Sequence, residues 1–179
     1  MNDVDTILAE LKRLGTKEGR EGLARYAIVA PKVFGVSVGQ LKVIAKPYRK
    51  NHKLALALWD TEWYEARMLT AFIDDPALVT PAQMDRWTND FDNWAICDST
   101  CFHLFDKTPH AFAKITQWEK KRGEFQRRAS FALLAGVALH DKKAPDENFL
   151  DALDLVEKAS TDERNFVRKG VVWALRSIA

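Results

Sequence analysis

Apolar residues recur at helical spacing along most of the chain. The first such stretch, residues 2–14, has five of them three or four positions apart: Val4, Ile7, Leu8, Leu11 and Leu14. This spacing places all five on one face of an α-helix, and Gly15 then ends the pattern. Ser37 precedes another such run and is the residue type that caps a helix N-terminus.

The same pattern predicts a chain of helices with short polar connections. We expect them at residues 2–14, 19–30 (ended by Pro31), from the Ser37 cap through 41–45 to Pro47, 51–59, 62–73 after an Asp60-Thr61 cap, 82–91, 94–105, 109–121, 125–140, 145–159 and 162–178. No stretch alternates with a period of two for long enough to indicate a sheet. The sequence therefore predicts an all-α protein built from antiparallel helix pairs.

A repeated cadence indicates how these pairs are arranged. An aromatic residue, a basic residue and a small or aromatic residue recur at the same spacing in three segments: Tyr64-x-x-Arg67-x-x-x-Ala71, Phe125-x-x-Arg128-x-x-x-Ala132 and Phe166-x-x-Lys169-x-x-x-Trp173. The last two segments start 41 residues apart, within the period of about 40 to 47 residues of HEAT-type repeats. We expect one domain, residues 1–179, forming an α-solenoid whose inner helices line a concave groove.

Composition excludes several classes of protein. The chain of 179 residues is 47% hydrophobic and 29% charged, which excludes disordered and fibrous chains. It has neither a run long enough to span a membrane nor the pattern of a signal peptide, so we expect a cytoplasmic protein. Its two cysteines, Cys97 and Cys101, match no zinc spacing, and we expect reduced thiols in the core, with no metal and no cofactor.

Charge is unevenly distributed although the net charge is only +2. Residues 1–60 hold 11 Lys/Arg and 6 Asp/Glu, residues 61–110 hold 3 and 9, and residues 111–179 hold 13 and 10, which gives +5, −6 and +3. Solvated helix faces would explain this distribution. The alternative is a polyanion held by both basic parts around a centre that carries carboxylates.

The candidate chemistry centres on Asp98. Trp94 precedes it by four residues, about one helical turn, so both side chains leave the same helix face. Apolar neighbours would partly desolvate the carboxylate, which then needs a cationic partner. If the inner helices line one groove, Arg128 and Trp173 converge on the same place. Taken singly, the two tryptophans could instead be core residues, and Asp98 and Arg128 a structural salt bridge.

Three motifs give the chain a resemblance to a known family. These are Trp94-x-x-x-Asp98, Gln126-Arg127-Arg128-Ala129 and the run from Phe166 to Arg176, FVRKGVVWALR. Together they resemble the AlkD-like DNA alkylation repair family of HEAT-like DNA glycosylases, from Tyr26 and Phe34-Gly35 to the C-terminus. The resemblance implies that Asp98 is the catalytic carboxylate and that Trp94 and Trp173 hold the deoxyribose of the lesion.

The resemblance also implies a DNA-binding surface and a substrate. Arg128 would bind the DNA backbone, Tyr26 would be a further contact, and the neighbouring cations would contribute: Arg127, Arg168, Lys169 and Arg176. The implied substrate is double-stranded DNA with N3- or N7-alkylated purines, and the bond cut is the N-glycosidic bond, without base flipping. We expect a monomer. The family usually continues beyond the Trp173 helix, so we expect a C-terminal capping unit to be lacking.

The chemistry is physically consistent with one carboxylate. An N3- or N7-alkylated purine already leaves as a cation, so no general acid has to protonate it. Positive charge then develops on the sugar, and a preplaced anion stabilises that transition state more than the ground state. The alternative hypothesis is a non-catalytic HEAT-like module that binds nucleic acid or protein.

Overall fold

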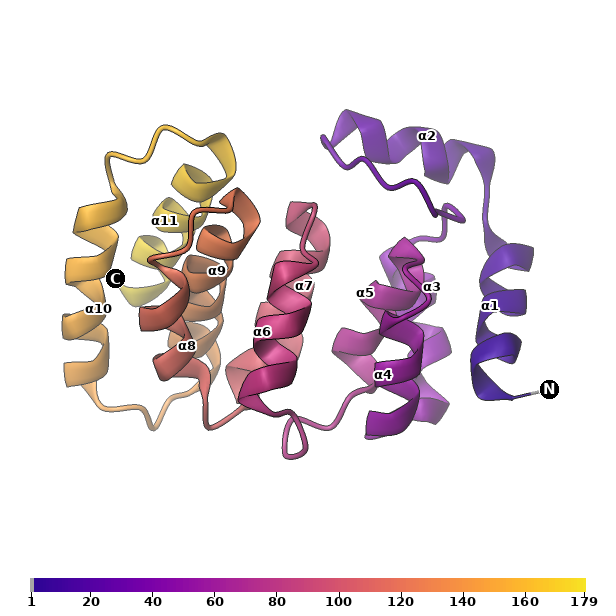
Figure 1. Cartoon of the computed structure of the whole chain (residues 1–179), viewed down its shortest axis with the longest axis horizontal. Coiled ribbons are helices and arrows are strands. Elements are labelled where there is room, and N and C mark those ends of the chain that lie inside the picture. Colours follow the sequence, from indigo (N-terminus) through magenta and orange to yellow (C-terminus); the bar gives the residue numbers. More distant parts are fainter. Residues whose placement is uncertain (1) are drawn as a thin grey trace. The chain divides into compact units, whose positions relative to one another are not determined.

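The structure is a computed structural model that describes residues 2–179 (Figure 1). These residues form eleven α-helices and two short 3-10 helices, and they contain no strand. The elements are α1 (Asp3–Leu14), α2 (Lys17–Arg25), α3 (Val38–Ala45), η1 (Lys46–Tyr48), α4 (His52–Trp59), α5 (Tyr64–Ile73), α6 (Pro81–Asn89), α7 (Trp94–His103), η2 (Phe105–Lys107), α8 (Ala111–Trp118), α9 (Glu124–His140), α10 (Asp146–Ala159) and α11 (Asn165–Ile178). The all-α prediction is confirmed.

The helices fall into two compact units. Unit 1 ends at Leu78 and contains α1 to α5, whereas unit 2 spans Val79–Ala179 and contains α6 to α11. All four residues of the predicted convergence, Trp94, Asp98, Arg128 and Trp173, belong to unit 2. Tyr26 belongs to unit 1.

Unit 2 is organised around α9. This helix packs against α7 on one side and α11 on the other, while α8 covers it from the second layer. Figure 1 shows α6, α8 and α10 in front of α7, α9 and α11. Helix α9 is buried without interruption from Arg128 to Val137, because it contacts neighbours around most of its circumference. Helices α7, α9 and α11 therefore form one layer, which carries the candidate site.

Helix ends are set by local capping, which the sequence predicts in part. Ser37 is the N-cap of α3, as expected, and forms a capping box with Gln40. The helix predicted at 19–30 instead begins at Lys17, where Thr16 caps it, and ends at Arg25. Ala27 then adopts a left-handed conformation, with φ 55°, which an α-helix cannot accommodate.

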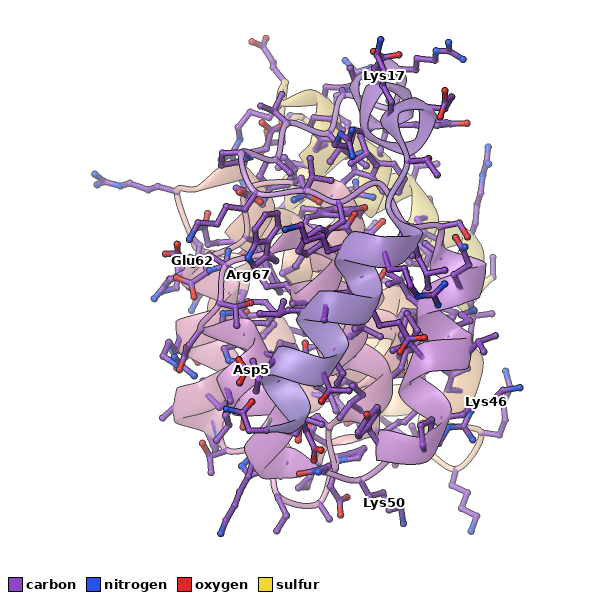
Figure 2. All side chains as sticks on the ribbon, turned by 90° about the vertical axis from the view of Figure 1, so that its right-hand side faces the viewer. Asp5, Lys17, Lys46, Lys50, Glu62 and Arg67 are labelled. Carbon is purple, nitrogen blue, oxygen red and sulfur yellow. The ribbon has the colours of Figure 1, made fainter. Side chains whose placement is uncertain are left out.

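Asp60-Thr61 does not cap the fifth helix. Helix α5 begins after Trp63, and Glu62 before it has φ 64°. Figure 2 shows Glu62 beside Arg67. Lys32 binds the Glu62 carboxylate from the preceding loop at 2.7 Å. The hydrogen bond and charge of Lys32, with a further contribution from the charge of Arg67, lower the pKa of Glu62.

A buried carboxylate holds the central loop of unit 1. Glu65 is fully buried and accepts hydrogen bonds from the backbone N–H groups of Phe34, Gly35 and Val36, the shortest being 2.6 Å from Gly35. Gly35 has φ 86°, and a Cβ there would lie 2.3 Å from the Thr16 carbonyl oxygen. Any side chain at this position would clash with the Thr16 carbonyl, so only glycine allows the loop to pass this close to Thr16.

Candidate active site

The first turn of α7 positions Trp94 and Asp98. Asn93 is buried and caps the helix, its Oδ1 accepting from the N–H of Ile96 at 3.0 Å. The cap fixes the point at which the helix starts, and with it the face on which Trp94 and Asp98 lie one turn apart. Both residues are half-buried. The spacing argument from the sequence is therefore confirmed for this pair.

Asp98 and Arg128 form a two-pronged ion pair between α7 and α9. Arg128 donates from Nε to Oδ1 and from Nη2 to Oδ2 of Asp98, both at 2.7 Å. Its Nη1 donates to the carbonyl oxygen of Phe166 on α11 at 2.6 Å. One guanidinium thus joins all three helices of the layer. This is the salt bridge that the more conservative reading of the sequence predicted, and a bidentate geometry is the strong form of such a pair.

Burial and pairing act in opposite directions on the Asp98 carboxylate. Burial raises the pKa of Asp98, and the hydrogen bonds and charge of Arg128 offset part of that increase. Burial also disfavours the charge on Arg128, but the hydrogen bonds and charge of Asp98 outweigh it and raise the pKa of the guanidinium. The Asp98 side chain retains 17% exposure and that of Arg128 only 7%. Of the two side chains, that of Asp98 is therefore the more accessible to solvent.

Trp173 lies next to the following turn of α7. Its ring is 5.6 Å from that of Phe102, centroid to centroid, and tilted by 30°. Phe102 follows Asp98 by four residues and also contacts the ring of His140 at 4.4 Å. The Nδ1 atom of His140 is hydrogen bonded to Asp106, whose side chain is fully buried. Trp173 is thus half-buried beside the helix face that carries Asp98.

The remaining predicted DNA contacts have different environments. Arg127 is bound by Glu119 and Asp162, each at 2.8 Å. Lys169 lies over the ring of Phe166, 5.7 Å from its centroid, and Arg176 is exposed. Arg168 lies in a surface depression with residues of α10, including Glu157. In unit 1, Tyr26 is 65% exposed. The DNA-binding roles of these residues, and of Arg128, stay predictions.

Two participants were missed by sequence reasoning. Phe102 was given no role in the sequence analysis, although its spacing of four residues from Asp98 places it on the same helix face. The Phe166 carbonyl could not have been found, because a backbone acceptor leaves no trace in the side-chain pattern.

Both cysteines are free and buried, with Sγ atoms 3.6 Å from carbonyl oxygens of α9.

Within residues 2–179, no three His, Cys, Asp or Glu side chains are grouped as metal ligands would be. Likewise, none of the helices described is both long and apolar enough to cross a membrane.

Comparison with known proteins identifies the fold and the family. The arrangement is that of a HEAT-like repeat protein: a solved structure from "a new family of proteins related to the HEAT-like repeat DNA glycosylases with affinity for branched DNA structures" superposes with a TM-score of 0.88. The two chains are 22% identical, and the match covers 99% of this chain and 76% of that one. No curated protein matches the sequence. The sequence model of the DNA alkylation repair enzyme family matches residues 7–179, and the chain belongs to this family.

Proposed function

We propose that the protein is a monofunctional DNA glycosylase that releases cationic N3- and N7-alkylated purines from double-stranded DNA. The observation that carries the proposal is the partly accessible Asp98 side chain, held by Arg128 one turn after Trp94. Membership of the DNA alkylation repair enzyme family supports the same substrate class.

The carboxylate retains acceptor capacity despite its ion pair. Each oxygen of Asp98 accepts one N–H of Arg128, and a carboxylate oxygen has two lone-pair sites. One site on each oxygen therefore remains for a water molecule or for the electrostatic stabilisation of a sugar. Arg128 also restricts the rotation of the carboxylate, so that no ordering is needed when the substrate arrives.

In the proposed reaction the C1′–N bond breaks first, and its electron pair neutralises the departing alkylpurine. The deoxyribose becomes an oxocarbenium ion, which Asp98 stabilises. A water molecule that donates a hydrogen bond to Asp98 adds its oxygen to C1′, and its proton passes to the carboxylate or to solvent. The indole faces of Trp94 and Trp173 would attract the same developing cation.

The charge of Arg128 sets a limit on this stabilisation. A guanidinium bound to the carboxylate weakens its field at the sugar, so the pair acts as a dipole with its negative end at the accessible edge. Such a site favours a leaving group that is already cationic. Uncharged purines, which require protonation before they leave, are expected to stay in place.

The second candidate function is DNA binding without chemistry. It is favoured by one observation, the fold shared with a protein family described as having affinity for branched DNA. Under this function Asp98 and Arg128 would only join α7 to α9 and α11. A four-way DNA junction would then bind more tightly than linear duplex, and no base would be released.

The deciding experiment measures release of 7-methylguanine from methylated duplex DNA under single-turnover conditions. Asp98→Asn is expected to reduce the rate constant about 100- to 1000-fold, the usual cost of removing one preorganised electrostatic group. Asp85→Asn is the matched control: Asp85 is also a carboxylate bound to a buried cation, Lys114 at 2.6 Å, but it lies between α6 and α8 in the other layer. The control is expected to keep the wild-type rate.

Two results would reject the proposal. Wild-type protein that releases no base above the spontaneous rate, while binding a four-way junction, would leave the non-catalytic function. An Asp98→Asn variant that is folded and as active as Asp85→Asn would show that the chemistry does not use this carboxylate.

A further inference from the structure

Unit 1 contains a long segment without acidic residues. Between Glu21 and Asp60 the chain has seven Lys and Arg residues and no Asp or Glu. Five of the seven are concentrated in twelve consecutive positions, and all five are exposed: Lys42, Lys46, Arg49, Lys50 and Lys53. We refer to these five residues as the basic cluster.

The fold gathers the basic cluster at one end of unit 1. Lys42 lies near the end of α3, Lys46 begins η1, and Lys53 lies in the first turn of α4. The turn between them is bound to the end of α5, because the N–H of Asn51 donates to the Ile73 carbonyl at 3.0 Å. Figure 2 shows Lys46 and Lys50 at the same end of this unit.

The cluster carries five cations, and the two acidic residues that follow α5 can offset only part of this charge. Asp74 follows α5, but it is buried and its carboxylate binds His52 at 2.7 Å. Asp75 accepts a hydrogen bond from the N–H of Ala77. The ammonium group of Lys42 lies over the ring of Phe72, 5.5 Å from its centroid. The cluster therefore presents a concentrated positive field to solvent.

The backbone at Lys50 provides a second observation. This residue has φ 62°, a left-handed conformation in which glycine or asparagine is usual and a long side chain is disfavoured. Glycine would fit this position more easily, so replacing Lys50 by glycine removes the charge without straining the backbone.

We propose that the basic cluster is a second DNA-binding surface, which contacts the phosphate backbone of duplex DNA without reading its sequence. The inference depends on the DNA partner of the proposed function but not on its chemistry. The surface adds affinity for the substrate, and it leaves bond cleavage to unit 2.

The test compares two triple variants that lose the same charge. Lys46→Gln/Arg49→Gln/Lys50→Gln removes three cations from the cluster, and Lys12→Gln/Arg13→Gln/Lys17→Gln removes three exposed cations from α1 and α2. The probe is undamaged linear duplex DNA, titrated at several salt concentrations. The slope of log K against log salt concentration is negative. If each of the three removed cations contacts one phosphate, this slope becomes shallower by about 2.7 in the cluster variant. The control keeps the wild-type slope.

Lys50→Gly separates charge from structure. Glycine removes the unfavourable side chain at φ 62°, so the thermal midpoint is expected to stay or rise while DNA affinity falls. A fall in the midpoint with unchanged affinity would assign Lys50 a structural role and would count against the proposal.

Equal salt slopes for both triple variants would overturn the inference. If wild-type protein bound vesicles of anionic lipid through the cluster and the cluster variant still bound DNA normally, the surface would belong to a membrane contact instead. Failure of the proposed function looks different, because base release would then be absent while the cluster variant still lost affinity for undamaged DNA.

Discussion

The two units each contain a carboxylate removed from bulk water, and they compensate it in different ways. Glu65 in unit 1 is fully buried and accepts three consecutive backbone N–H groups. Asp98 in unit 2 is bound on one side by a guanidinium and retains an accessible edge. Backbone donors enclose a carboxylate completely and make it structural, whereas a single flat cation leaves room for a ligand. The difference indicates which of the two carboxylates can act on a substrate.

The largest expected effect tests Glu65, the fully buried carboxylate of unit 1. Glu65→Ala leaves three buried N–H groups without an acceptor, and at about 1 to 3 kcal/mol for each unsatisfied group we expect a loss of about 3 to 9 kcal/mol in unfolding free energy. Urea denaturation measures it. Glu62→Ala is the control, because its ion pair with Lys32 is exposed and exposed pairs contribute little to stability. Similar losses for both variants would contradict the anchoring role of Glu65.

The second largest effect tests the ion pair between Asp98 and Arg128. Arg128→Met leaves the Asp98 charge without its partner, and removing one member of a buried pair costs about 3 to 5 kcal/mol. The double variant Asp98→Asn/Arg128→Met should recover part of this loss, because no buried charge remains. A double variant as unstable as the single one would show that packing, not charge, dominates here.

The loss of unfolding free energy caused by Arg128→Met should also depend on pH. Burial raises the pKa of Asp98, and the variant lacks the cation that opposes this effect. A carboxyl group whose pKa is higher in the folded than in the unfolded state binds its proton more tightly when folded. The stability deficit of the variant should therefore shrink as the pH falls from 7 towards about 4, near the ordinary pKa of aspartate.

The smallest expected effect concerns a carboxylate with the opposite shift. Hydrogen bonds from Arg164 lower the pKa of Asp162 to about 2, with further contributions from the charges of Arg164 and Arg127, although desolvation opposes them. Its stabilising contribution is present above the unfolded-state pKa and is lost as the pH falls towards 2. The difference in thermal midpoint between the wild type and Asp162→Asn should therefore be full at pH 6, small at pH 2 and absent at lower pH. A difference that grows on acidification would contradict this assignment.

Much of the helical framework could be predicted because it depends on local pattern. The predicted helix at 125–140 is found at Glu124–His140, and that at 145–159 is found at Asp146–Ala159. The helical pattern of apolar residues is weaker in unit 1. Helix α2 has two glycines among its nine residues, and none of the nine residues is buried. Its ends are set by the Thr16 cap and by the left-handed Ala27. The N–H groups of Ala27 and Ile28 donate to carbonyl oxygens of the last turn, those of Ala24 and Leu23, and helix periodicity does not predict such a termination.

The sequence by itself determined the succession of helices, the family, and the placement of Trp94 and Asp98 on one helix face, since all three follow from residues close together or in a fixed order. Only the tertiary structure decided what the two neighbouring arginines bind. Adjacent residues of a helix point about 100° apart, so Arg128 meets Asp98, 30 residues away, while Arg127 meets Glu119 and Asp162. The side on which each helix neighbour packs is a property of the assembled core. No local pattern encodes it.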